Sequence, residues 1–88
     1  MGARRRRDRL VSDISVDVEL DVRQLVCPLP ILRAKKSLAQ MQSGQVLKVV
    51  ATDNKAPDDF VDFCAKTGNE LLSSTEQGGE YILLIRRR

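Results

Sequence analysis

The sequence predicts an α/β fold, an α+β two-layer sandwich in which two helices cover one face of a four-stranded mixed sheet. Three observations predict it: period-two alternation near residue 16, two segments with apolar residues at helical spacing, and paired glycines between the last two β-rich segments. The element order is β-α-β-α-β-β. At 88 residues, the chain has room for one domain.

The first strand and the first helix follow from the spacing of their apolar residues. Apolar and acidic residues alternate in Val16, Asp17, Val18, Glu19, Leu20 and Asp21, which predicts a strand with one buried face. Pro28 and Pro30 are tolerated in the first turn of a helix, where N–H groups lack intrahelical partners. The apolar stripe Ile31, Ala34, Leu38 and Met41 then predicts a helix over about 28–42, with Gly44 as a left-handed cap.

The rest of the domain has equally plain signals. A β-rich segment at 46–52 predicts a strand parallel to the first. Asp58 and Asp59 suit the first turn of a helix, Phe60, Val61, Phe63 and Cys64 form its apolar stripe, and Gly68 ends it. Strands over 70–76 and 80–86 form a hairpin around Gly78 and Gly79. The last strand is apolar on both sides, so we expect it to be central or covered.

Charge is distributed unevenly along the chain. Five of its fifteen basic residues lie within residues 1–9 and three more at 86–88, which leaves seven basic and eleven acidic residues over 10–85. We interpret residues 1–12 as a flexible basic tail and 13–88 as one domain. The alternative is that Arg4–Arg7 form an electrostatic handle for RNA or an acidic partner. The acidic domain and its few aromatic residues argue against direct nucleic-acid binding.

Residue counts exclude several classes of site. The chain has no histidine and two cysteines, Cys27 and Cys64, so a structural zinc site and a Cys-His or Ser-His-Asp nucleophile are excluded. We expect no metal and no cofactor. The longest apolar run, Tyr81–Ile85, is too short to span a membrane, and no secretory signal is evident, so we expect no membrane association. We expect a cytoplasmic location, where thiols stay reduced.

Cys27 precedes the first helical proline and is the candidate catalytic residue. Near a helix N-terminus, with the N–H groups of Leu29 and Ile31 facing the sulfur, we expect a thiol pKa below its ordinary value. Arg23 and Lys35 are the candidate cations beside it. The alternative is a small buried apolar cysteine. Cys64 shows the opposite pattern: it lies within an apolar stripe and is predicted to belong to the core, with a resolving cysteine as the alternative.

The segment Leu20–Pro30 contains the spacing Leu-Asp-x-x-x-Leu-x-Cys-Pro-x-Pro. It resembles the signature of the TusA/SirA-like family of small sulfur-carrier proteins, and the resemblance extends from Leu20 to Arg87. It implies the same β-α-β-α-β-β sandwich. The family's two motif aspartates match Asp21 and Asp53, which we expect to organise the loops through backbone N–H groups, with ordinary turn chemistry as the alternative. Gln24 stands where the family usually has glycine, so its loop is restricted if a positive φ is needed.

The resemblance implies a sulfurtransferase-type persulfide carrier acting within a relay. Cys27 would accept sulfur from a cysteine desulfurase or rhodanese and pass it to an acceptor protein in tRNA thiolation, molybdenum-cofactor maturation or sulfur oxidation. Leu32, Arg33 and Lys36 form a mixed apolar and basic patch suited to docking a partner, although an exposed leucine also occurs without function. The alternative function is a non-catalytic regulatory or protein-interaction module in which Cys-Pro-x-Pro only caps a helix.

Overall fold

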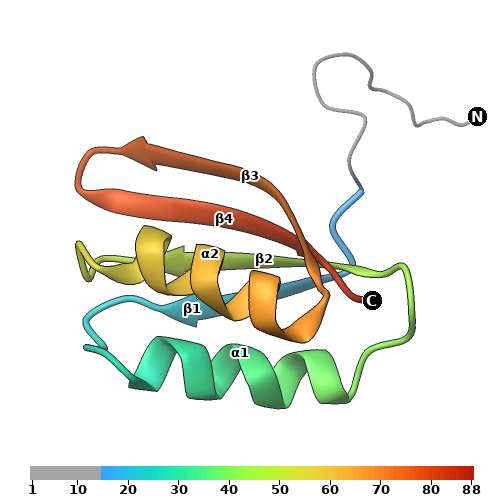
Figure 1. Cartoon of the computed structure of the whole chain (residues 1–88). Coiled ribbons are helices and arrows are strands. Elements are labelled where there is room, and N and C mark those ends of the chain that lie inside the picture. The colour runs from blue at the N-terminus through green and yellow to red at the C-terminus, as the bar shows by residue number, and fades with distance from the viewer. Residues whose placement is uncertain (1–14) are drawn as a thin grey trace, which may run out of the picture.

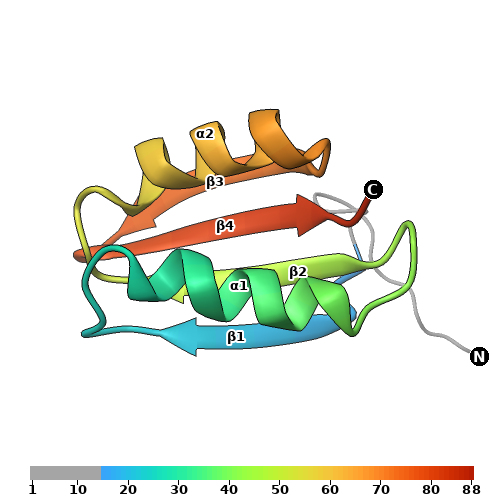
Figure 2. The same ribbon diagram turned by 60° about the horizontal axis from the view of Figure 1, so that its bottom comes forward.

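The computed structural model describes residues 15–88, in which two helices pack on one face of a four-stranded sheet (Figures 1 and 2). In chain order the elements are β1 (Val18–Val22), α1 (Leu29–Ala39), β2 (Val46–Ala51), α2 (Ala56–Thr67), β3 (Glu70–Gln77) and β4 (Glu80–Arg86). The predicted fold class and element order are confirmed. The predicted tail over 1–12 falls outside the described residues.

The strand order β1-β2-β4-β3 makes β4 a central strand. β1 pairs with β2 in parallel, and β4 is antiparallel to both β2 and β3. This position explains why β4 is apolar on both sides: Leu83 and Ile85 are buried under the helices, while Ile82 and Leu84 lie half-buried on the other face. Of the two sequence-based explanations for β4, the central position is confirmed.

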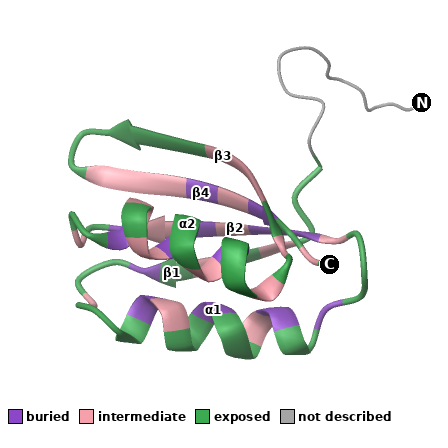
Figure 3. Cartoon of the chain, viewed as in Figure 1, coloured by how far each residue is buried: buried purple, intermediate pink, exposed green. Residues whose placement is uncertain are grey.

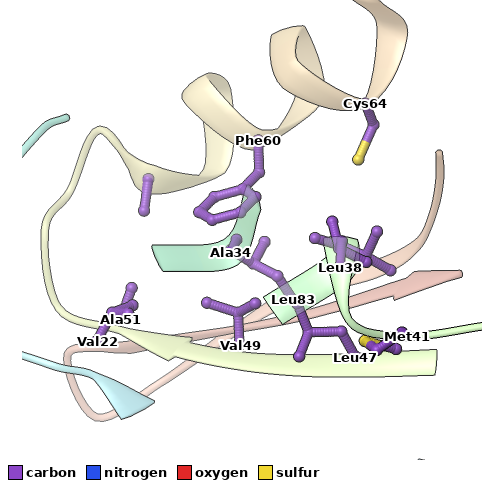
Figure 4. Close-up of a cluster of buried hydrophobic side chains, with 12 residues drawn as sticks. Val22, Ala34, Leu38, Met41, Leu47, Val49, Ala51, Phe60, Cys64 and Leu83 are labelled. Atoms are coloured by element: carbon purple, nitrogen blue, oxygen red, sulfur yellow. The ribbon is translucent and has the colours of Figure 1, made fainter. Parts of the chain in front are cut away.

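The core lies between the helices and the sheet (Figures 3 and 4). Alternate residues of each strand face the helices. Residues that pair in register on neighbouring strands therefore pack together against the apolar sides of the helices, as Val22 does with Ala51 and Val49 with Leu83. The buried cluster consists of Val22, Ala34, Leu38, Met41, Leu47, Val49, Ala51, Ala56, Phe60, Cys64, Leu83 and Ile85. Burying these side chains is the main favourable term holding the helices on the sheet.

The first helix is shorter than the sequence predicts. It ends at Ala39 rather than near residue 42, with Gln40 as a right-handed C-cap whose N–H donates to Ser37 and Leu38. Arg87 closes this end, because its Nε donates to the Leu38 carbonyl oxygen at 2.7 Å. Gly44 has a φ of +89° but lies in the following turn, so its predicted role as the helix cap is wrong.

Two glycine predictions are confirmed and one apolar assignment is wrong. Gly68 ends α2 in the left-handed conformation, with its N–H donating to Cys64. Gly78 and Gly79 both have positive φ in the two-residue β3–β4 turn. Val61, however, is 55% exposed, because α2 turns Phe60 and Cys64 toward the sheet and leaves Val61 on its outer side.

The connections that follow β1 and β2 lie at the same edge of the sheet (Figure 1). This is a consequence of parallel pairing, which brings the carboxyl ends of both strands together. The loop containing Cys27 therefore adjoins the start of α2. These two connections and the first turns of the two helices form the candidate functional site.

Candidate functional site: the Cys27 loop and the groove between the helices

Cys27 lies in the loop between β1 and α1, and both it and the preceding Val26 are exposed. The Cys27–Pro28 peptide bond is cis. Pro28 is the N-cap of α1, and Leu29 begins the helix. Cys27 therefore lies one residue before the N-cap of α1, where a sulfur atom of another protein can reach its thiol. A buried apolar role for Cys27 is excluded.

Of the two N–H groups expected to face the sulfur, those of Leu29 and Ile31, the expectation for Leu29 is wrong. The Leu29 N–H donates to the Val26 carbonyl oxygen at 2.8 Å, so it does not face the thiol. This N–H is therefore not available to stabilise an anion on Cys27.

Asp53 joins the two connections at the sheet edge. One of its carboxylate oxygens accepts a hydrogen bond from the Cys27 N–H at 2.8 Å, and the other accepts from the Lys55 N–H at 3.1 Å. These two backbone bonds lower the pKa of Asp53, because they stabilise its charged form. The carboxylate fixes the backbone of Cys27 relative to the start of α2.

Gln24 has a left-handed backbone conformation, which glycine adopts more readily than any other residue. Its φ is +69°, in the left-handed region, and its N–H donates to the Thr52 hydroxyl at 2.8 Å. The Leu25 N–H then donates to the Val22 carbonyl oxygen at 3.2 Å. The loop that leads to Cys27 therefore keeps a tight turn with a side chain at the strained position.

Asp21 and Arg23 form an exposed cluster with Glu80 and do not line the groove that contains Cys27. Arg23 donates to Asp21 from its backbone N–H, Nε and Nη2, each at 3.0 Å, and reaches Glu80 at 3.3 Å through Nη1. These contacts lower the pKa of Asp21 to about 2 and raise that of Arg23. Arg23 is committed to this exposed cluster, and the cation that acts on Cys27 is Lys55. Neither Arg23 nor Lys35 is among the causes of the Cys27 shift, although Lys35 lines the same groove as the thiol.

A groove of about 390 Å³ runs between the two helices from Cys27. Ile31, Leu32 and Phe63 supply apolar surface, and charged residues from both helices lie along it. Its lining consists of Cys27, Pro28, Ile31, Leu32, Lys35, Asp59, Asp62, Phe63, Lys66 and Thr67. Leu32 of the predicted docking patch lines this groove and is 54% exposed. Arg33 and Lys36 are exposed on α1 outside the lining.

The pKa of the Cys27 thiol is raised, contrary to the expectation from its position before a helix. The largest cause is the Asp59 carboxylate at the start of α2. Partial desolvation and the charge of Asp53 add to it, and the charge of Lys55 opposes them. Carboxylates close to a thiol disfavour its anion. The direction of the shift is therefore determined mainly by Asp59, a residue in the first turn of α2.

Asp59, Lys55 and Thr52 are site residues that the sequence reasoning did not identify. From the sequence alone, Asp58 and Asp59 indicate only a favourable start of a helix. A signal for Asp59 was nevertheless present, because parallel strands bring the helix starts that follow them to one edge of the sheet.

Cys64 is 5% exposed in the core, close to the edge-to-face pair of Phe60 and Phe63, whose ring centroids are 6.1 Å apart. Burial raises the pKa of its thiol. Its predicted core position is confirmed. Within residues 15–88, no group of three or more acidic, cysteine or histidine side chains could hold a metal ion. No helix in this part of the chain has the length and apolar character needed to cross a membrane.

Comparisons with known proteins agree with this geometry. The model of the family described as sulfurtransferase TusA matches residues 18–87. The chain belongs to the TusA family. The sulfur carrier protein TusA of Allochromatium vinosum is 56% identical over 71 residues, which cover 81% of this chain and 93% of that protein. A TusA sulfur carrier of Pseudomonas entomophila is 37% identical over 78 residues, covering 89% and 98% of the two chains.

The fold comparison extends the TusA assignment to solved structures. The crystal structure of a SirA-like protein from Desulfitobacterium hafniense superposes with a TM-score of 0.72 at 25% identity. It covers 80% of this chain and 96% of that one. Family membership confirms the resemblance carried by the Cys-Pro-x-Pro segment. The chain is a sulfur carrier of the TusA family, and a sulfur carrier works in a relay with a donor and an acceptor.

Proposed function

We propose that this TusA-family chain carries sulfur as a persulfide on Cys27. The single observation that carries the proposal is the exposed thiol at the start of α1, held at its backbone by Asp53 and open to a groove that a partner can enter. A buried cysteine could not exchange sulfur with another protein, because exchange requires direct contact between the reacting sulfur atoms.

The transfer is a thiol exchange at sulfur. The Cys27 thiolate attacks the sulfane sulfur of a donor persulfide, the donor's S–S bond breaks, and the donor leaves as a thiolate while Cys27 becomes the persulfide. An acceptor nucleophile later attacks the terminal sulfur, and the Cys27 thiolate is the leaving group. The protein supplies position and electrostatics, with no cofactor in either step.

The donor is proposed to be a cysteine desulfurase or a rhodanese, and the acceptor a protein of tRNA thiolation, molybdenum-cofactor maturation or sulfur oxidation. Leu32, with Arg33 and Lys36 beside it on α1, forms the proposed docking patch, since an exposed apolar side chain with flanking cations suits a protein partner. Asp21, Arg23, Pro28, Pro30 and Asp53 are proposed to support the loop. We place the relay in the cytoplasm, a reducing compartment that preserves free thiols.

One observation favours the alternative of a non-catalytic interaction module. The raised pKa of Cys27 reduces the thiolate fraction at neutral pH, which lowers the rate of nucleophilic attack. The loss of rate is smaller than the loss of thiolate, because a thiolate with a higher pKa is a stronger nucleophile. Persulfide loading separates the two functions.

The decisive experiment is incubation with a cysteine desulfurase and cysteine, followed by intact-mass analysis without reductant. The wild-type chain and Cys64→Ser should each gain the mass of one sulfur atom, and Cys27→Ser should gain none. Cys64→Ser is the matched control, because it removes the other thiol of the chain. Normal loading of Cys27→Ser, or no loading of the wild type, contradicts the proposal and favours the interaction module.

A further inference from the structure

A second pocket continues the groove away from Cys27. It has a volume of about 270 Å³ and shares Lys35, Phe63 and Thr67 with the groove that contains the thiol. The two helices run side by side in the same direction (Figures 1 and 2), and this pocket lies at their far ends. We call it the basic pocket. The rest of its lining consists of Leu38, Ala39, Asn69, Arg87 and Arg88.

The two ends of this continuous surface differ in charge. Beside Cys27 the groove is lined by two aspartates and two lysines, so the charges of its side chains balance. The basic pocket is lined by Lys35, Arg87 and Arg88 and by no acidic side chain. A partner that extends from the thiol into the basic pocket is therefore favoured by a negative charge at its far end.

Backbone contacts hold the two arginines at the ends of the helices. Arg87 is largely used by the fold, because its Nε donates to the last turn of α1 at 2.7 Å and its Nη1 to the Arg88 main-chain oxygen at 2.8 Å. The Arg88 N–H donates to Asn69 Oδ1 at 2.8 Å, and its side chain lies against Gly68. Within residues 15–88, neither the Lys35 ammonium nor the Arg88 guanidinium forms an ion pair. These two cations are available to a partner.

We propose that the groove and the basic pocket together hold an extended segment of the sulfur donor, with its persulfide at Cys27 and a carboxylate in the basic pocket. The inference rests on the proposed function, because it names the chemistry of the protein that loads Cys27. The occupant is the donor, because the donor is the partner that meets Cys27 as a free thiol. When the sulfur is transferred, the donor's S–S bond breaks and the donor leaves as a thiolate.

The length of α1 determines the spacing within the donor segment. The helix has 11 residues, and at about 1.5 Å per residue it spans roughly 16 Å. An extended chain advances about 3.3 Å per residue, so a carboxylate about five residues from the persulfide cysteine reaches the basic pocket. The side chains of Ile31, Leu32 and Phe63 line the groove between these points and favour apolar residues in the donor segment.

The test is the rate at which Cys27 of the whole chain attacks synthetic peptides activated as mixed disulfides with 2-thiopyridine, an uncharged leaving group whose release is followed by absorbance. Each peptide has one cysteine and an apolar segment, and ends five residues after the cysteine in a carboxylate or an amide. The wild type should react about twofold to fivefold faster with the carboxylate peptide, the range for one exposed ion pair. Cys27→Ser should release no thiopyridine.

Two measurements on the wild type test the charge and the reach of the peptide. The preference for the carboxylate should fall toward one in high salt, because salt screens exposed charges. It should also be absent for peptides that end two residues after the cysteine, because they span only about 7 Å when extended. A preference that is insensitive to salt, or that is equal for the short peptides, contradicts the inference.

Arg88→Gln should lower the preference, and the double variant Lys35→Gln and Arg88→Gln should abolish it. Arg86→Gln is the matched control. It removes the same charge two residues earlier, but Arg86 is paired with Glu70 at 3.1 Å and does not line the basic pocket. Its preference should equal that of the wild type. If the cations only balance the helix ends, Arg88→Gln changes the unfolding midpoint and leaves the ratio of the two rates unchanged.

Equal rates for the two five-residue peptides in the wild type, or a preference that Arg88→Gln retains in full, overturns the inference. Desulfurase loading of the wild type keeps this result separate from the proposed function. Loading without a carboxylate preference defeats only the donor segment. A carboxylate preference without loading defeats only the carrier proposal.

Discussion

The two cysteines occupy opposite environments and yet have pKa values shifted in the same direction. Cys27 is exposed in a loop, and its pKa is raised chiefly by the Asp59 carboxylate. Cys64 is buried in the core, and its pKa is raised by desolvation alone. The cause determines what can follow. A neighbouring charge can be neutralised by a partner, whereas burial is relieved only by opening the core.

The largest expected effect comes from placing a charge at each cysteine, which tests the difference in burial between Cys27 and Cys64. Cys64→Asp should destabilise the fold by about 3 to 5 kcal/mol, the scale for an uncompensated buried charge. Cys27→Asp, its matched variant at the exposed site, should leave the urea midpoint close to the wild-type value. Urea unfolding followed by circular dichroism measures both. A small loss for Cys64→Asp would mean that the core around α2 opens easily.

The backbone near each cysteine offers a second comparison. Gly68 follows the helix of Cys64 with a φ of +86°, and Gln24 precedes Cys27 with a φ of +69°. Gly68→Ala should cost about 1 to 2 kcal/mol from the left-handed backbone, and the added Cβ would meet Arg88 at 2.7 Å. Gln24→Gly should instead stabilise the chain by up to about 1 kcal/mol, because glycine removes the strain but adds freedom to the unfolded state. Thermal unfolding of both variants tests the opposite signs.

The smallest effect is the pH dependence of stability in the alkaline range. Both thiols have raised pKa values in the folded chain, so it retains protons that the unfolded chain releases. Stability from this source is fully present below the unfolded thiol pKa of about 8.5 and declines as the pH rises above it.

Urea midpoints measured between about pH 7 and pH 10 report this decline. Cys27→Ala and Cys64→Ala should each flatten it, and the double variant should flatten it most. If neither single variant changes the slope, the thiols do not differ between the folded and unfolded states, and the comparison between them fails.

Local patterns were enough to predict most of the fold. The stripe through Ala34 and Leu38 marked α1, and the pair Gly78-Gly79 marked the hairpin, because both signals arise within a few consecutive residues. The end of α1 could not be predicted this way. It depends on Arg87, which caps the helix from the far end of the chain.

In the candidate site, too, features that depend on nearby residues could be predicted, and features that depend on distant residues could not. The exposure of Cys27 followed from its place before two prolines. The direction of its pKa shift did not, because it depends on Asp59, a residue of the second helix. The helix-start argument considered one helix alone, whereas the sheet places the acidic start of α2 beside the loop. Charges brought together by tertiary packing override the effect of a single local motif.

The carboxylates beside Cys27 also bear on chemical survival between transfers. Peroxide converts cysteine to sulfenic acid through its anionic form, so a sulfur that keeps its proton reacts slowly with oxidants. An exposed sulfur is otherwise the most vulnerable atom that a small protein can display. Because the pKa of Cys27 is raised, we expect its thiol to react more slowly with peroxide than an exposed cysteine of ordinary pKa, while it stays reachable by a partner.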